Sequence, residues 1–128
     1  MSQIARYLLN LAGEYRVCSE LNKRGILATI TYGAHKGADV YAISNRQSIK
    51  IEVKTSQRDQ FVTNVSRKDD NPNSPGFWNR QAENLGAPEF WVFVQVIRGE
   101  ETNSFQERFF VLSHKELCAV QSTRNATY

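Results

Sequence analysis

Apolar residues recur every three or four positions at the start of the chain, between Ser2 and Arg24. This spacing is typical of an amphipathic helix, and Gly25 follows as a stop signal. The next segment, Ile26 to Tyr32, is rich in β-branched residues and predicts a strand. The apolar positions that define the helix are Ile4, Leu8, Leu11, Tyr15, Cys18 and Leu21.

The middle of the chain predicts a β-hairpin. Residues 33–37 form a loop with a glycine at each end. Two strands are then expected, from Asp39 to Ser44 and from Ser48 to Thr55, with a turn at residues 45–47 between them. The polar stretch that follows, Gln57 to Leu85, predicts a long loop, because residues 69–76 hold too many turn formers for regular structure.

The last third predicts two more strands and a helix. Phe90 to Ile97 is apolar at every position except Gln95, which is typical of a central strand buried on both faces. After a turn over residues 99–106, a strand is expected from Arg108 to Leu112. Ser113 is suited to cap a short helix that ends at Val120, with a frayed tail beyond it.

These elements predict one α/β domain over residues 1–128, with a mixed sheet. The chain has 128 residues, 41% of them hydrophobic, and no apolar run of the roughly 18 residues needed to cross a bilayer. The N-terminus lacks the features of a secretory signal, so a cytoplasmic protein is expected. Cys18 and Cys118 are then expected to be buried thiols, and His35 and His114 solvent-exposed residues outside any zinc site.

The positive charge is concentrated in the first half of the chain. Residues 1–54 contain eight basic and four acidic residues, for a net charge of +4, whereas the remainder has eight basic and nine acidic residues. A basic half favours a polyanionic partner such as nucleic acid, although many ordinary domains show as much.

The strand residues 49–54 alternate strictly between apolar and polar side chains, so Glu52 and Lys54 share one face. A hairpin that pairs residues 39–44 with 49–54 brings Asp39 towards both of them. Two carboxylates and a backbone carbonyl suit Mg²⁺, which prefers oxygen ligands. With a lysine beside the metal, such a group is suited to hydrolyse a phosphodiester bond.

The order of these residues resembles the PD-(D/E)-x-K nuclease superfamily, which includes many restriction endonucleases and archaeal Holliday junction resolvases. The resemblance covers roughly residues 10–57 and departs from the nominal motif at Ala38, where the family pattern has proline. It implies a restriction endonuclease-like sheet flanked by helices. The segments that carry it are Gly13-Glu14, Gly37-Ala38-Asp39, Glu52-Val53-Lys54 and Thr55-Ser56.

The resemblance also implies roles for individual residues. Asp39, Glu52 and the Val53 carbonyl would hold Mg²⁺, with Mn²⁺ as a substitute, and Lys54 would serve the attacking water. Glu14 would be a further residue of the catalytic site. Its position in the helix supports this role, because it lies at the edge of the apolar stripe, where burying a carboxylate costs free energy unless a metal ion or another cation is nearby. Candidate substrate contacts are Lys36, Ser56, Gln57 and Gln95.

The expected function is a Mg²⁺-dependent endonuclease that acts on DNA as a homodimer. The first alternative is a protein with the nuclease fold but without catalysis, which acts as a binding or protein-interaction module. The second alternative is a purely structural domain with surface charges at these positions. Basic and aromatic residues in the long loop would contact nucleic acid. Alternatively, the basic residues are simply exposed to solvent and the aromatic residues pack against the core. They are Arg58, Arg67, Lys68, Phe77, Trp78 and Arg80.

Overall fold

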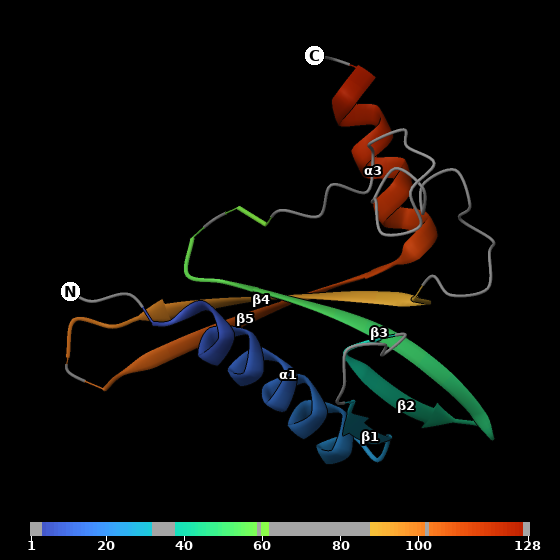
Figure 1. Ribbon diagram of the computed structural model, residues 1–128, viewed down its shortest axis with the longest axis horizontal. Coiled ribbons are helices and arrows are strands. Elements are labelled where there is room, and N and C mark those ends of the chain that lie inside the picture. The colour runs from blue at the N-terminus through green and yellow to red at the C-terminus, as the bar shows by residue number, and fades with distance from the viewer. Residues whose placement is uncertain (1–3, 32–37, 59, 62–87, 102, 127–128) are drawn as a thin grey trace.

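The computed structural model describes residues 4–31, 38–58, 60–61, 88–101 and 103–126, with side chains in the last helix up to Val120. Five strands form one sheet in the order β1-β2-β3-β4-β5, in which only the β3–β4 pair is parallel (Figure 1). The expected α/β fold with a mixed sheet is confirmed. In chain order the elements are α1 (Arg6–Lys23), β1 (Leu27–Ile30), β2 (Val40–Ser44), β3 (Gln47–Ser56), β4 (Phe90–Arg98), β5 (Phe105–Ser113) and α3 (His114–Ala126).

Helices α1 and α3 lie on opposite sides of the sheet (Figure 1). Strand β4 shows the cause, because its alternate side chains enter two different hydrophobic clusters. Val92, Val94 and Val96 pack in the cluster of α1, whereas Trp91 and Phe93 pack with Leu117 and Cys118 of α3. The expectation that this strand is buried on both faces is therefore confirmed. Within the described residues, neither helix is long and apolar enough to cross a membrane.

Helix α1 ends as its sequence predicts. Gly25 has a φ of +82°, a conformation that glycine adopts without strain. This lets the Gly25 N–H donate to the Asn22 carbonyl at 3.0 Å and the Ile26 N–H donate to the Leu21 carbonyl at 2.9 Å. Together these bonds satisfy the last carbonyls of the helix. The start differs from the expectation, since the helix begins at Arg6 rather than near Ser2.

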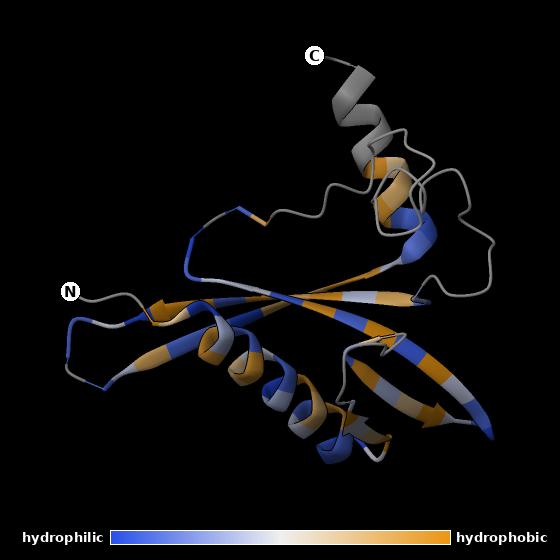
Figure 2. Cartoon of the chain, in the orientation of Figure 1, coloured by the Kyte–Doolittle hydropathy of each residue, from blue (hydrophilic) through white to orange (hydrophobic). Residues whose placement is uncertain are grey.

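The β2–β3 turn is one residue shorter than expected. Asn45 and Arg46 both have positive φ, so two residues are enough to reverse the chain. Val40 consequently pairs with Ile51, a shift of two positions from the expected pairing of 39–44 with 49–54. A shift of two keeps every side chain on its predicted face. The alternation of polar and apolar bands along β3 is visible in Figure 2.

The last strand and helix are both longer than the sequence indicates. Strand β5 begins at Phe105 rather than at Arg108, because it pairs with β4 along the whole length of that strand. Helix α3 continues to Ala126, past the expected end at Val120. Its start is as predicted: the Glu116 N–H donates to Ser113 Oγ at 3.1 Å, and the Ser113 N–H donates to Glu116 Oε1 at 2.9 Å. This reciprocal pair is a capping box.

The capping box predicts a loss of stability in acid. The Ser113 N–H and hydroxyl hold the pKa of Glu116 below its ordinary value. A lowered pKa means that the stabilisation is present at neutral pH and is lost as the pH falls through the pKa of Glu116 in the folded protein. Glu116→Gln should therefore destabilise the protein in urea unfolding at pH 7, and the difference from wild type should shrink in acid. A difference that stays constant would contradict this.

One buried polar group on α3 corrects the sequence analysis. His114, expected to be exposed, is only 4% exposed, because the first residue of α3 packs against β4. Trp91 Nε1 donates to His114 Nδ1 at 3.1 Å, and His114 Nε2 lies 3.5 Å from the Sγ atom of Cys118. The other expected histidine, His35, lies outside the described residues.

Both cysteines are buried free thiols, as expected. Burial raises the pKa of Cys18 and Cys118, and the Glu14 carboxylate adds to the rise at Cys18. Because the thiolate is the reactive form, neither thiol should react appreciably with Ellman's reagent in the folded protein. Two thiols per chain should react rapidly once the protein is unfolded in guanidinium. Fast reaction of either thiol in the native protein would contradict the observed burial.

Candidate active site

A cleft of about 570 Å³ lies between the first half of α1 and the second half of β3. It exists because β3 is longer than its neighbour: the pairing with β2 stops at Ile51, and β3 continues to Ser56. The edge of β3 beyond Ile51 is therefore open on the β2 side. The polar residues that line the cleft are Arg6, Asn10, Glu14, Asp39, Glu52, Lys54, Thr55, Ser56, Gln57, Arg58 and Gln60.

Asp39 directly precedes the first residue of β2, Val40. Its N–H donates to the Ile51 carbonyl at 3.1 Å, and its Oδ2 atom accepts a hydrogen bond from the Val53 N–H at 2.9 Å. The carboxylate thus takes the place of the missing β2 backbone acceptor. This bond fixes a carboxylate that is only 9% exposed at the wall of the cleft.

Glu52 and Lys54 lie on the same face of β3, as the alternation predicts. The residues between and beside them, Ile51 and Val53, point to the other face and belong to the core under α1. Lys54 Nζ lies 4.0 Å from Glu52 Oε1, with side-chain exposures of 38% and 17%. Both side chains line the cleft, so the lysine is held beside an acidic group and remains open to solvent.

Glu14 reaches the same cleft from α1 and is 7% exposed. The helix comes this close to β3 because residue 13 is glycine: a Cβ atom there would lie 1.8 Å from Thr55 Oγ1. The structure therefore places Glu14, Asp39, Glu52 and Lys54 along the lining of a single cleft.

The donor atoms of the cleft match a cation that keeps part of its water shell. Among the described residues, no three acidic, histidine or cysteine side chains gather closely enough to hold a metal ion alone. Asp39 and Glu52 nevertheless line the cleft together with Val53. The N–H and C=O of one strand residue point to the same side, so the Val53 carbonyl also faces the open edge. Two carboxylates, a carbonyl and water suit Mg²⁺.

The other predicted contacts have different outcomes. Ser56 and Gln57, two of the predicted substrate contacts, line the cleft. Gln95 does not; it is buried, and its Nε2 atom donates to the Arg58 carbonyl at 3.4 Å. Arg58 itself lines the cleft. The remaining candidates lie outside the described residues; they are Lys36, Arg67, Lys68, Phe77, Trp78 and Arg80.

Two polar lining residues on α1 were missed by the sequence analysis. Arg6 and Asn10 line the cleft beside Glu14. Their spacing could have predicted this position, because residues four apart on a helix lie on one face. Counting back from Glu14 in steps of four gives Asn10 and then Arg6.

No protein-family model and no curated protein matches this chain. Among solved structures, the chain is similar to that of the bacterial homing endonuclease I-Ssp6803I, with a TM-score of 0.45 and 14% sequence identity. The similarity covers 87% of this chain and 77% of that chain. A likeness of this size carries no functional argument, so the function is inferred from the cleft itself.

Proposed function

We propose that this protein is a metal-dependent endonuclease that hydrolyses phosphodiester bonds of DNA in the cleft between α1 and β3. One observation carries the proposal: Asp39, Glu52 and Lys54 line a single cleft, with the buried Glu14 beside them. Carboxylates and a lysine at the open edge of a strand are the groups that metal-assisted phosphodiester hydrolysis requires. The order of these residues in the sequence also resembles the PD-(D/E)-x-K pattern.

In this proposal Asp39, Glu52 and the Val53 carbonyl hold Mg²⁺, with Mn²⁺ as a substitute. When bound, the metal lowers the pKa of a water molecule and offsets charge on the phosphate. Water attacks phosphorus, the bond from phosphorus to one backbone oxygen breaks, the attacking water gives up a proton to solvent, and the departing oxygen takes a proton from solvent.

The protein's own side chains orient the reactants. Lys54 donates a hydrogen bond to the attacking water or to a phosphate oxygen, and its charge offsets that of the transition state. Ser56 and Gln57 lie just beyond Lys54 along the chain and donate hydrogen bonds to the same phosphate. Asp39 is held in place by the Val53 N–H, so it needs little reorganisation when the cation enters. Glu14 adds negative charge that favours a divalent cation.

The decisive experiment is a cleavage assay. The protein is incubated with supercoiled plasmid, a single strand and a four-way junction in Mg²⁺, Mn²⁺ or EDTA. Metal-dependent nicking supports the proposal. Binding without cleavage in every metal would instead support a non-catalytic binding module. Absence of binding, of cleavage and of specific Mn²⁺ affinity would show that the charged side chains of the cleft bind neither nucleic acid nor a metal ion.

We further propose that the enzyme acts as a homodimer. One cleft of this size holds one active site and cuts one strand, so cleavage of both strands of a duplex requires two copies. Light scattering during gel filtration, with and without duplex, measures the mass directly. A monomer that linearises plasmid in a single binding event would contradict this part of the proposal.

A further inference from the structure

The cleft continues from its acidic residues to a cationic end. On α1 the polar lining residues Glu14, Asn10 and Arg6 are spaced four apart and therefore form one stripe along the helix. A helix rises about 1.5 Å per residue, so Arg6 lies about 12 Å from Glu14 along the axis. The stripe changes from a carboxylate through an amide to a guanidinium.

A second stripe of lining residues runs along β3 and the residues after it. Glu52, Lys54 and Ser56 alternate along one face of the strand, and Arg58 follows two residues later. All four line the cleft. This stripe also changes from acidic to basic, in the direction in which β3 runs.

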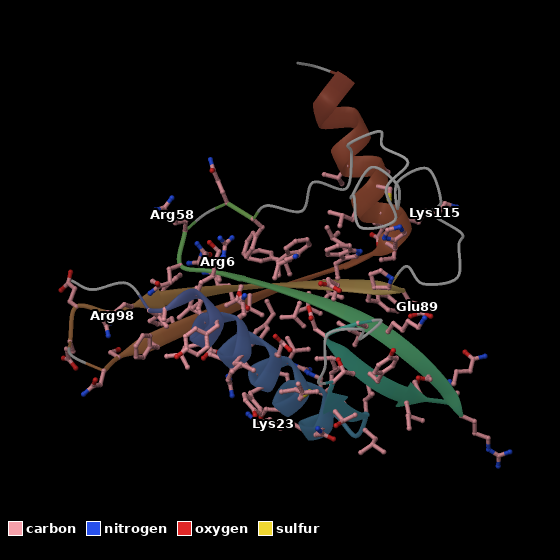
Figure 3. The ribbon with its side chains drawn as sticks, viewed as in Figure 1. Arg6, Lys23, Arg58, Glu89, Arg98 and Lys115 are labelled. Carbon is pink, nitrogen blue, oxygen red and sulfur yellow. The ribbon has the colours of Figure 1, made fainter. Side chains whose placement is uncertain are left out.

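The two arginines meet at one end of the cleft. Arg6 begins α1 and Arg58 follows β3, and both lie at the end where the start of the helix meets the end of the strand (Figure 3). Both side chains are exposed. Within the described part of the chain, neither guanidinium forms an ion pair with a carboxylate. Two guanidinium groups at one end of the cleft, neither paired with a carboxylate among the described residues, are suited to bind an external anion.

The backbone at Arg58 is held by two side chains. Its N–H donates to Ser56 Oγ at 2.9 Å, and its carbonyl accepts the bond from Gln95 Nε2 at 3.4 Å. Gln95 is buried within β4. The buried amide thus anchors the segment that carries Arg58 and keeps it at the mouth of the cleft.

We infer that Arg6 and Arg58 bind a second phosphate of the nucleic-acid strand, separate from the phosphate that is cleaved. The inference rests on the proposed function, which places the reacting phosphate at the acidic end near Glu52 and Lys54. The distance between the two ends requires a substrate that spans several nucleotides. A diester with a single phosphorus cannot occupy both ends.

The salt dependence of binding tests this inference without any need for cleavage. Fluorescence anisotropy in EDTA measures the affinity for a labelled duplex and a labelled single strand at several salt concentrations. Each lost phosphate contact should reduce the slope of log K against log[salt] by about 0.9 for duplex or about 0.7 for a single strand. The double variant that combines Arg6→Gln with Arg58→Gln should show this reduction in slope. Arg46→Gln, an exposed arginine in the β2–β3 turn, is the matched control and should not.

A second measurement separates this inference from the proposed function. If the proposed function holds, the double variant should lose a larger factor of its cleavage rate on an oligonucleotide than of its rate on bis(p-nitrophenyl) phosphate. Equal slopes for the double variant, the Arg46 control and wild type would overturn the phosphate site even if cleavage is intact. A reduced slope only in the double variant would support the site even if no cleavage is found.

Discussion

Replacing Lys54 with methionine is expected to lower the rate of DNA cleavage by about two to four orders of magnitude, the usual contribution of a group that transfers protons or stabilises charge in the transition state. Methionine keeps the length and the apolar stem of the side chain but removes the ammonium group. Because the Lys54 side chain is 38% exposed, the fold should lose little stability. Nicking of supercoiled plasmid in Mg²⁺ measures the effect.

A matched lysine makes this result specific. Lys50 lies on the same strand and the same face as Lys54 but does not line the cleft. Lys50→Met removes the same charge and should retain nearly all activity. Equal losses in the two variants would show that overall charge, rather than a group placed in the cleft, supports cleavage.

Asp39→Asn tests the proposed metal site separately from the fold. The asparagine side-chain oxygen can still accept the hydrogen bond from the Val53 N–H, so the start of β2 keeps its contact with β3. The negative charge is lost, and Mn²⁺ affinity measured by calorimetry should fall together with cleavage. An unchanged Mn²⁺ affinity would exclude Asp39 as a ligand.

The convergence of these residues was predictable because it depends on local rules. Alternation along β3 puts Glu52 and Lys54 on one face whatever their neighbours are. A tight hairpin places Asp39 beside that strand, and the two-residue error in register was harmless because side-chain orientation repeats every two residues. The position of Glu14 at the edge of the apolar stripe followed from the helical period alone.

Features that depend on contacts distant in sequence could not be predicted in the same way. The stripe from Glu14 to Arg6 can be recognised in the sequence, but the sequence does not show which strand the helix packs against. Gln95 was a recognisable polar residue in an apolar strand, yet its partner is the Arg58 carbonyl, 37 residues away. His114 is buried only because α3 packs on β4. The start of β5 at Phe105 follows the length of β4 rather than its own composition.

Gly13→Ala is expected to destabilise the protein by about 1–3 kcal/mol, the usual cost of overpacking a well-packed contact. Alanine normally stabilises a helix interior by up to about 1 kcal/mol relative to glycine, so the predicted sign is opposite to the helix preference. The reason is Thr55, whose Oγ1 and Cβ atoms would lie 1.8 and 2.9 Å from the new methyl group. Threonine is branched at Cβ, and rotation about χ1 cannot remove both contacts. Urea unfolding measures the change.

The same contact links stability to the active site. The clash is relieved when α1 moves away from β3, and that movement withdraws the buried Glu14 from the cleft, so cleavage should fall with stability. Thr55→Ala should reverse part of both effects, since it removes the Oγ1 contact and a buried hydroxyl that has no hydrogen-bond partner among the described residues. In a double-mutant cycle, Gly13→Ala should cost at least about 0.5 kcal/mol less in the Thr55→Ala background. Additive effects would show that Gly13 is not required for the close approach of α1 to β3.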